Sequence, residues 1–273
     1  MSTLIKRSIT GLIFITVLIS SIVWNEYSFG VLFLIISILG QAEFYRLGKH
    51  AEIQPQNVSG IMLGSILFIG IFGYFSEAIP LLYNIVALPF LLLIPIVELY
   101  SNKQKPFLNI AFTYLGAIYI SLSFATLSAL AFYKGTYNYE LILGIFFIIW
   151  SNDTGAYLVG SKIGKRKLFE RVSPKKSWEG SIGGGIIAMG IGFLLSNWFT
   201  SISVIHWLVL SAIVVIFGTI GDLIESLFKR SINVKDSGNI LPGHGGILDR
   251  FDSVIFAAPA AMFYIYFIRI FFE

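Results

Sequence analysis

The chain has 273 residues, of which 56% are hydrophobic and 12% are charged. This charged share is about half that of an ordinary soluble domain, so the composition excludes a water-soluble globule and favours a protein whose solvent is the lipid bilayer. The net charge is +4 and cysteine is absent, which excludes disulfides, thiolate nucleophiles and cysteine metal sites.

Apolar runs separated by Gly, Pro, Asn and charged residues predict about nine candidate transmembrane helices. Most approach or exceed the roughly 17 to 25 residues that cross a bilayer. In chain order they are Ile9–Trp24, Phe29–Tyr45, Gly60–Phe75, Pro80–Leu99, Phe107–Phe132, Leu141–Val159, Gly180–Phe199, Ile205–Leu227 and Val254–Phe272. We therefore expect an all-α, polytopic integral membrane protein.

Basic residues between these runs predict the orientation. If the N-terminus is cytosolic, every Lys and Arg except Lys134 and Arg269 falls on the cytosolic side. Short cytosolic loops carry an excess of Lys and Arg. We therefore expect a cytosolic N-terminus and a C-terminus on the opposite side of the membrane.

Five acidic residues lie in the cytosolic thirds of the predicted spans. They are Glu43, Glu98, Asp153, Asp222 and Glu225. A carboxylate in hydrocarbon costs from about 2.5 kcal/mol upward, so it usually lines a wet cavity, binds a cation or reaches the interface. We interpret Glu43 and Glu98, each alone near the end of a span, as reaching the interface or pairing with a nearby Lys or Arg.

Polar motifs concentrate after Trp150. We therefore interpret residues 1–273 as a single membrane domain, with anchoring helices in 1–140 and catalytic helices and cytosolic loops in 141–273. Asn152 and Asp153 interrupt the sixth span, in the sequence WSNDTGAYLVG. Asp153 could hold a metal or a ribose hydroxyl, and the alternative is a hydrogen bond between helices.

The loop after the sixth span, GSKIGKRKLFERVSPKKSWEGSIGGG, is strongly basic. We expect Ser173 to begin a turn or helix that presents Lys175 and Lys176, with Glu179 nearby, because lysine as a point charge suits a triphosphate. An ordinary positive-inside loop that touches anionic lipid is the alternative. For the glycines at 183–185 we expect close helix packing, since the sequence does not fit a phosphate-binding P-loop.

The second loop runs from the eighth span into the ninth, as GDLIESLFKRSINVKDSGNILPGHGGILDRFDS. Asp222, Glu225 and Lys229 are spaced to share one helical face, while Asp249 and Asp252 form an i, i+3 pair at the start of the last span. Facing carboxylates suit a hard divalent cation, which prefers oxygen ligands. The glycine-rich turn at 242–246 allows backbone N–H groups to approach a phosphate.

This second loop resembles the signature of the phosphatidate cytidylyltransferase (CDP-diacylglycerol synthase) family. The matching residues are Ser226, Lys229, Arg230, Lys235, Asp236, Pro242, His244, Gly245, Gly246, Asp249, Arg250 and Asp252. The segments NDTGAY and SPKKSWEG also look like those of that family. The resemblance covers roughly residues 150–253 in detail and the rest only in hydropathy.

The resemblance implies a membrane enzyme that makes CDP-diacylglycerol and pyrophosphate from CTP and phosphatidate. It also implies a requirement for Mg²⁺, allows a second cation such as K⁺, and implies a homodimer. By matching position, Asp222 and Asp249 would hold the metal, and Glu225 is our additional candidate ligand.

Charge and spacing extend this set of candidate residues. Our candidate catalytic residues are Asp222, Asp249, Lys229, Arg230 and Asp252. Our candidate substrate-binding residues are Ser173, Lys175, Lys176, Glu179, Lys235, Asp236, His244, Gly245, Gly246, Arg250, Asn152 and Asp153.

Two other function classes place carboxylates in membrane spans. Other membrane lipid-phosphate transferases carry motifs such as DGxxAR or repeated Asp-rich segments, which this sequence lacks. An ion-coupled transporter usually carries inverted repeats, and the two halves here are unlike. We expect CTP, phosphatidate and membrane lipids as partners, no nucleic acid, and a bacterial inner (plasma) membrane with the active site facing the cytosol.

Overall fold

The computed structural model describes residues 3–240, 243 and 245–272. Helices dominate because a helix satisfies its backbone hydrogen bonds within one segment, as the hydrocarbon core of a membrane requires. The helices are α1 (Thr3–Trp24), α2 (Glu26–Gly48), η1 (Lys49–Ala51), α3 (Asn57–Phe75), η2 (Leu81–Val86), α4 (Ala87–Leu99), α5 (Pro106–Gly116), η3 (Ala117–Leu122), α6 (Ser123–Ala131), α7 (Glu140–Ile163), α8 (Trp178–Leu195), α9 (Val204–Ser231) and α10 (Leu248–Phe272).

Each predicted apolar run corresponds to a described helix or to a continuous helical stretch. The run Phe107–Phe132 contains α5, a π-helical turn η3 and α6, which follow one another without a break. Eight helices in the described part of the chain are long and apolar enough to cross a membrane. The first predicted span falls on α1, whose apolar described part, Ser8–Trp24, is shorter. The prediction of a helical integral membrane protein is confirmed.

Two short strands are the exception to the all-α prediction. Strand β1 (Lys167–Phe169) pairs antiparallel with β2 (Ser173–Ser177). The expectation that Ser173 and Pro174 begin a turn or helix was therefore wrong. Pro174 lacks an N–H donor, and an edge strand tolerates this loss better than a helix interior.

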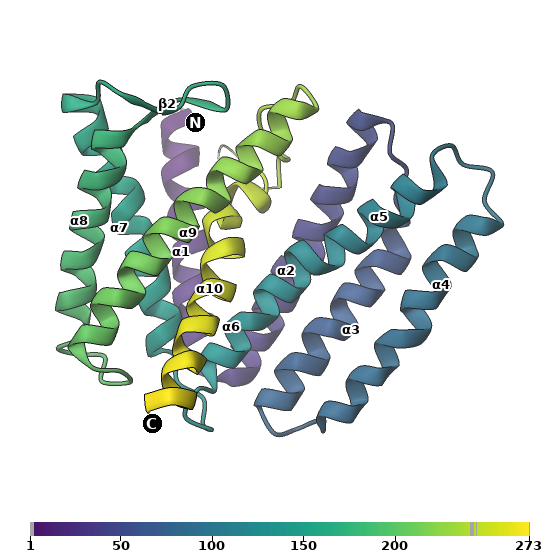
Figure 1. The fold of residues 1–273 in the computed structure, drawn as a ribbon, viewed down its shortest axis with the longest axis horizontal. Helices are drawn as coiled ribbons and strands as arrows, with labels where there is room; N and C mark the ends of the chain where they lie inside the picture. Colours follow the sequence, from purple (N-terminus) through teal and green to yellow (C-terminus); the bar gives the residue numbers. More distant parts are fainter. Residues whose placement is uncertain (1–2, 241–242, 244, 273) are drawn as a thin grey trace. The chain divides into compact units, whose positions relative to one another are not determined.

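The chain divides into two compact units. The first contains Met1–Tyr137 and Ser231–Phe251, and the second contains Asn138–Arg230 and Asp252–Glu273. In the first unit α2, α3 and α4 lie side by side (Figure 1). The ring of Phe251 contacts Phe14, Phe33 and Phe124 with centroid separations of 5.7, 6.5 and 5.5 Å. These contacts join the end of the second loop to the N-terminal helices.

Polar side chains connect the helices of the first unit. Gln41 on α2 donates to the carbonyl of Gly60 on α3 at 3.1 Å, and Tyr45 donates to the carbonyl of Thr113 on α5 at 2.7 Å. The hydroxyls of Ser37 and Ser121 are 2.6 Å apart. Hydrogen bonds and small residues commonly hold helices together in membranes, where the lipid is as apolar as the side chains.

Glu98 on α4 belongs to this internal network. Its side chain is 2% exposed, and it accepts hydrogen bonds from Gln56 Nε2 at 2.9 Å and from Asn109 Nδ2 at 2.7 Å. Our interpretation that Glu98 reaches the interface or pairs with a cation was wrong. Two neutral amides satisfy the buried carboxylate, one from Gln56 at the start of α3 and one from Asn109 on α5. Their positions could not be inferred from the Lys and Arg residues near Glu98 in the sequence.

In the second unit α7 and α8 lie side by side (Figure 1). Glycines make this approach possible, because a Cβ on Gly184 would lie 2.5 Å from the carbonyl oxygen of Asn152. A Cβ on Gly155 would lie 3.0 Å from the Cα of Gly184. The predicted role of the 183–185 glycines in close helix packing is thus confirmed at Gly184.

Replacing Gly184 with alanine should therefore separate α7 from α8. We expect a loss of about 1–3 kcal/mol in the free energy of unfolding, as for an overpacked core. Gly190→Ala on the same helix is the matched control, since nothing lies within 4 Å of its Cβ position. Thermal unfolding of the detergent-purified variants measures the difference, and equal midpoints would contradict the packing role.

Candidate active site

The last turns of α9 carry a group of charged side chains in the second unit. Asp222 forms an ion pair with Lys176 of β2 and accepts a hydrogen bond from Ser226 Oγ at 3.3 Å. Glu225 and Lys229 form an i, i+4 ion pair at 2.6 Å. Both members of that second pair are buried. Buried charges require such partners, because an isolated ion loses its hydration.

Helix α10 adds another carboxylate to this group. Gly221 allows the approach of α9 and α10, since a Cβ there would lie 2.6 Å from the carbonyl oxygen of Asp252. The carboxylate of Asp252 experiences electrostatic repulsion from Asp222, Glu225 and Asp153. Asp252 therefore lies close to the acids of α9 within the second unit, whereas Asp249, the other acid predicted to face them, belongs to the first unit.

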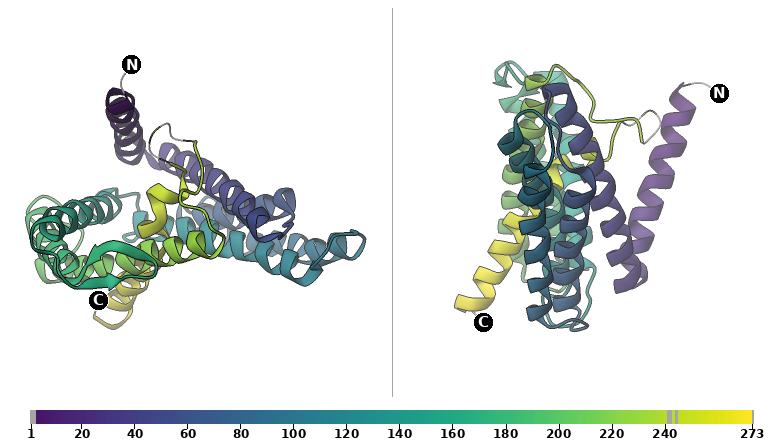
Figure 2. Two further views of the ribbon diagram at one scale, coloured as in Figure 1. Left: turned by 90° about the horizontal axis from the view of Figure 1, so that it is seen from above. Right: turned by 90° about the vertical axis from the view of Figure 1, so that its right-hand side faces the viewer.

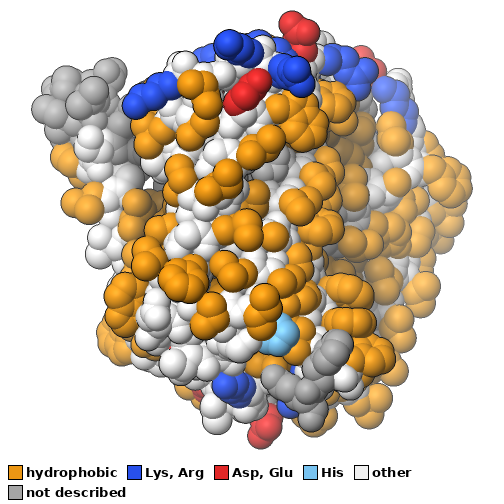
Figure 3. Space-filling view, turned by 60° about the vertical axis from the view of Figure 1, so that its left-hand side comes forward, with side chains coloured by type: hydrophobic (Ala, Val, Ile, Leu, Met, Phe, Trp, Pro, Cys, Tyr) orange, Lys and Arg blue, Asp and Glu red, His pale blue; other side chains and the backbone are white. Residues whose placement is uncertain are grey.

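The β1–β2 hairpin presents basic residues beside this acidic group. Side chains alternate along a strand, and accordingly Lys175 is exposed while Lys176 is half-buried against Asp222. Ser177 caps the start of α8 by accepting from the Gly180 N–H at 3.1 Å. Glu179 accepts from the backbone N–H groups of Lys165 and Arg166 at 3.0–3.2 Å. In Figure 3, Lys and Arg side chains gather at the end of this face where the hairpin lies.

Asp249 has a different set of contacts in the first unit. Its carboxylate accepts from the backbone N–H of Ser237 at 3.0 Å and from that of Gly246 at 2.8 Å. Gly245 has a φ of +85°, and a Cβ there would lie 2.5 Å from Asp249 Oδ2. Glycine tolerates this backbone region without steric cost. Asp249 thus closes the turn that precedes α10.

Glu43 lies on α2 and was misinterpreted from the sequence. Its side chain is 0% exposed, and its Oε2 accepts from the backbone N–H of Leu248 at 3.0 Å and from Ser237 Oγ at 3.3 Å. It neither reaches the interface nor pairs with a cation. The only local signal was a carboxylate in an apolar span, and its partners lie about two hundred residues further along the chain.

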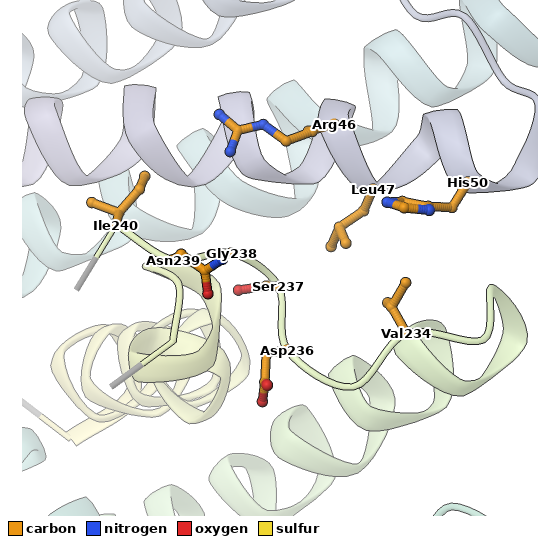
Figure 4. A pocket seen from close by; sticks show the side chains of 9 residues that line it. All are labelled: Arg46, Leu47, His50, Val234, Asp236, Ser237, Gly238, Asn239 and Ile240. Atoms are coloured by element: carbon orange, nitrogen blue, oxygen red, sulfur yellow. The ribbon is translucent and has the colours of Figure 1, made fainter. Parts of the chain in front are cut away.

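A cavity of about 420 Å³ opens beside the same segment of the first unit. Figure 4 shows the segment from Val234 to Ile240 running alongside the end of α2, with His50 and Leu47 directed toward it. Arg46 and Asp236 also line the cavity. Of these residues only Asp236 was a candidate from the sequence. Arg46 was included only among the basic residues on the predicted cytosolic side, and His50 was not considered.

The predicted site residues divide between the two units. The second unit holds Asn152, Asp153, Ser173, Lys175, Lys176, Glu179, Asp222, Glu225, Lys229, Arg230 and Asp252. The first unit holds Lys235, Asp236, Gly245, Gly246, Asp249 and Arg250. Pro242 and His244 lie outside the described residues.

The acidic side chains offer oxygen ligands for a cation. Among residues 3–240, 243 and 245–272, no three acidic or histidine side chains come close enough together to form a complete metal site. The donor set nonetheless consists of carboxylate oxygens, and Mg²⁺ is typically bound by one or two carboxylates together with water and substrate phosphates. The residues present therefore fit a hard divalent cation that is completed by other oxygens.

Comparison with known proteins identifies the family to which the chain belongs. Residues 5–268 match the family described as the cytidylyltransferase family. A phosphatidate cytidylyltransferase of Bacillus subtilis (strain 168) is 34% identical over 262 residues, covering 94% of this chain and 96% of that protein. That of Staphylococcus saprophyticus is 39% identical over 180 residues, covering 65% of this chain and 66% of that protein. That of Staphylococcus aureus (strain COL) is 41% identical over 162 residues, covering 58% of this chain and 60% of that protein. With its helical membrane fold, its acidic and basic groups on α9 and β2, and a match over nearly its full length, this chain belongs to the cytidylyltransferase family.

Proposed function

We propose that this chain is a phosphatidate cytidylyltransferase, which transfers CMP from CTP to phosphatidate and yields CDP-diacylglycerol and pyrophosphate. The observation that carries the proposal is the charged group on α9 and β2, in which Lys176 pairs with Asp222 and Lys229 pairs with Glu225. Two polyanionic substrates must meet in this reaction. Such a site supplies both cations for phosphate oxygens and carboxylates for a metal ion.

The reaction joins a phosphate oxygen of phosphatidate to the α-phosphorus of CTP. The bond from the α-phosphorus to the oxygen that bridges it to the β-phosphorus breaks in line with this attack, and pyrophosphate leaves with the bonding electrons. A phosphomonoester has a second pKa of about 6 and is already largely ionised near neutral pH. The protein therefore needs no general base, and its main tasks are alignment and charge neutralisation.

The basic side chains have distinct tasks in this proposal. Lys176 is half-buried, and release of its ammonium group from Asp222 would let it bind a phosphate oxygen of CTP. Lys229 is held by Glu225 at the buried end of the group. Lys175 and Arg230 are exposed, so they are available to screen the approaching anions.

Asp222, Asp249 and Glu225 are the proposed ligands of Mg²⁺, and a second cation such as K⁺ is compatible with the remaining carboxylates. When bound, Mg²⁺ would neutralise phosphate oxygens and stabilise the pyrophosphate leaving group. The family signature supports the first two ligands. The burial of Glu225 within the same charged group supports the third.

The proposal extends to the location and assembly of the enzyme. We place the N-terminus and the active site on the cytosolic face of a bacterial inner membrane, with about nine spans, because the basic residues favour that orientation. CTP is present on that side. We also propose a homodimer, on the resemblance to the family alone.

The proposed activity is tested by giving detergent-purified protein phosphatidate, CTP and Mg²⁺ and measuring CDP-diacylglycerol and pyrophosphate. We expect CTP-specific product formation that stops when a chelator removes the metal. Asp222→Asn and Asp249→Asn should each lower kcat by at least about 100-fold, because each removes a carboxylate proposed to hold the ion.

Thermal unfolding of both variants controls for folding. Full activity in both folded variants would contradict the assignment of Asp222 and Asp249 as metal ligands but would leave the proposed reaction unaffected. A folded wild type that forms no product with varied lipids and cations would contradict the reaction itself and favour an ion-coupled transporter.

Lys176 should matter to CTP through its position beside Asp222. Lys176→Met should lower kcat/KM for CTP by about 10- to 100-fold, since a hydrogen bond to a charged group contributes roughly 1.5–3 kcal/mol. Lys167→Met on the neighbouring strand removes an equal charge from an exposed position and should change kcat/KM by less than about fivefold. Steady-state kinetics compares the two, and equal losses would mean that only the total charge of the hairpin matters.

The absence of native cysteine makes the topology directly measurable. Lys134→Cys and Lys165→Cys each introduce one thiol at an exposed position. A membrane-impermeant maleimide should label Lys134→Cys in intact cells and Lys165→Cys only after the membrane is opened. The reverse pattern would overturn the proposed orientation.

A further inference from the structure

Glu43 is a fully buried carboxylate that has no role in the proposed reaction. It lies on α2, far from the family signature in sequence, and its side chain is 0% exposed. Burial of a carboxylate in a membrane span is costly unless the group gains compensating hydrogen bonds. Its partners therefore indicate what the residue does.

Glu43 accepts hydrogen bonds from the segment that precedes and begins α10. Oε2 accepts from Leu248 N at 3.0 Å and from Ser237 Oγ at 3.3 Å. Leu248 is the first residue of α10. The first N–H groups of a helix have no partner within the helix and carry partial positive charge, so an external carboxylate stabilises this end.

Two glycines of the same segment pack directly on the carboxylate. A Cβ on Gly238 would lie 2.5 Å from Glu43 Oε1, and a Cβ on Gly246 would collide with both carboxylate oxygens. Real Cβ atoms do not approach so closely. The backbone of the segment is thus closed around the side chain of Glu43 on two sides, in addition to the two hydrogen bonds.

The same backbone groups also hold Asp249. Ser237 donates its N–H to Asp249 and its hydroxyl to Glu43. Gly246 donates its N–H to Asp249 and packs against Glu43. Figure 2 shows the segment reaching across α2 on the side where α1 lies. Movement of Glu43 would therefore be transmitted to Asp249 through Ser237 and Gly246.

From this geometry we infer that Glu43 is a positioning residue, which fixes residues 237–238 and 246–248 and through them the carboxylate of Asp249. Glu43 itself touches no reacting atom. The inference rests on the proposed cytidylyl transfer for its kinetic consequence, but its structural consequence is measurable without substrate.

Glu98 provides a matched control. It is also a carboxylate buried in a membrane span, and it also takes its hydrogen bonds from neutral groups. Its partners Gln56 and Asn109 make further hydrogen bonds to Gln54, Ile94, Gln104 and Thr113. Glu98→Gln therefore reports the cost of altering a buried carboxylate network without altering the segment before α10.

The first experiment compares Glu43→Gln with Glu98→Gln by hydrogen exchange, thermal unfolding and steady-state kinetics. We expect Glu43→Gln to increase amide exchange at residues 237–240 and 245–248 and to lower kcat/KM by about 10- to 100-fold, the range seen when a residue supporting a metal ligand is removed. The concentration of Mg²⁺ needed for half-maximal activity should rise. Glu98→Gln should lower the unfolding midpoint as much or more, with unchanged exchange in that segment.

A second pair of variants tests the contact with Gly238 and does not depend on the folding of Glu43→Gln. Gly238→Ala pushes a methyl group against Glu43 Oε1 and should produce the same local exchange and kinetic loss. Glu43→Asp withdraws the carboxylate by about 1.5 Å, one carbon–carbon bond, and makes room for that methyl group. The double variant should therefore lose less activity than the sum of the two single effects on ΔG‡.

The outcomes separate the inference from the proposed function. The positioning role would be overturned if folded Glu43→Gln showed the amide exchange and kcat/KM of the wild type. It would also be overturned if the effects of Gly238→Ala and Glu43→Asp were additive. Equal exchange across the whole chain in Glu43→Gln and Glu98→Gln would overturn it as well. If the wild type makes no CDP-diacylglycerol, the proposed function fails, while local exchange at 237–240 and 245–248 still decides whether Glu43 holds the segment.

Discussion

A carboxylate in a membrane span must be hydrogen-bonded or paired, and this constraint organises both units of the protein. In the first unit Glu43 and Glu98 take neutral hydrogen bonds from distant parts of the chain. In the second unit Asp222 and Glu225 are paired with Lys176 and Lys229. Asp222 takes its partner from the basic hairpin, whereas the buried Glu225 pairs with Lys229 one turn further along α9.

Neutral hydrogen bonds and ion pairs have different chemical consequences for the carboxylates that they stabilise. An ion pair can exchange its partner for a phosphate or a metal ion, since each member remains charged and retains its affinity for ions. A carboxylate closed in by glycine backbone has no room for such an exchange. The acids of α9 are therefore suited to chemistry, and Glu43 and Glu98 are suited to holding structure.

The sequence predicted the helices well because apolar runs, and the Gly, Pro and Asn residues that interrupt them, are local signals. The spacing of Asp222, Glu225 and Lys229 likewise predicted their common face on α9, and the structure adds the ion pair between the last two. The β1–β2 hairpin was missed because a five-residue strand containing Pro174 has no clear period. The partnership of Asp222 with Lys176 links positions 46 residues apart, and no periodic pattern encodes such a contact.

Glu43 illustrates a further limit of sequence analysis. Its neighbours along α2 suggested a carboxylate near Arg46 at the end of a span, and that local context is correct. Its actual partners, Ser237 and Leu248, are determined by the tertiary fold. The glycine-rich turn at 242–246 predicted a close backbone approach to a phosphate, but the sequence did not reveal that Gly246 packs against Glu43.

The hydrogen bond between Glu43 and Leu248 joins positions 205 residues apart, and this separation has a consequence for biosynthesis. A ribosome adds about 5–20 residues per second, so α2 is complete long before the first residue of α10 exists. During that interval the carboxylate lacks both of its native partners. It must remain neutral, hydrated or shielded by other components until the C-terminal helix arrives. The first unit therefore reaches its final structure only after Leu248 has been synthesised.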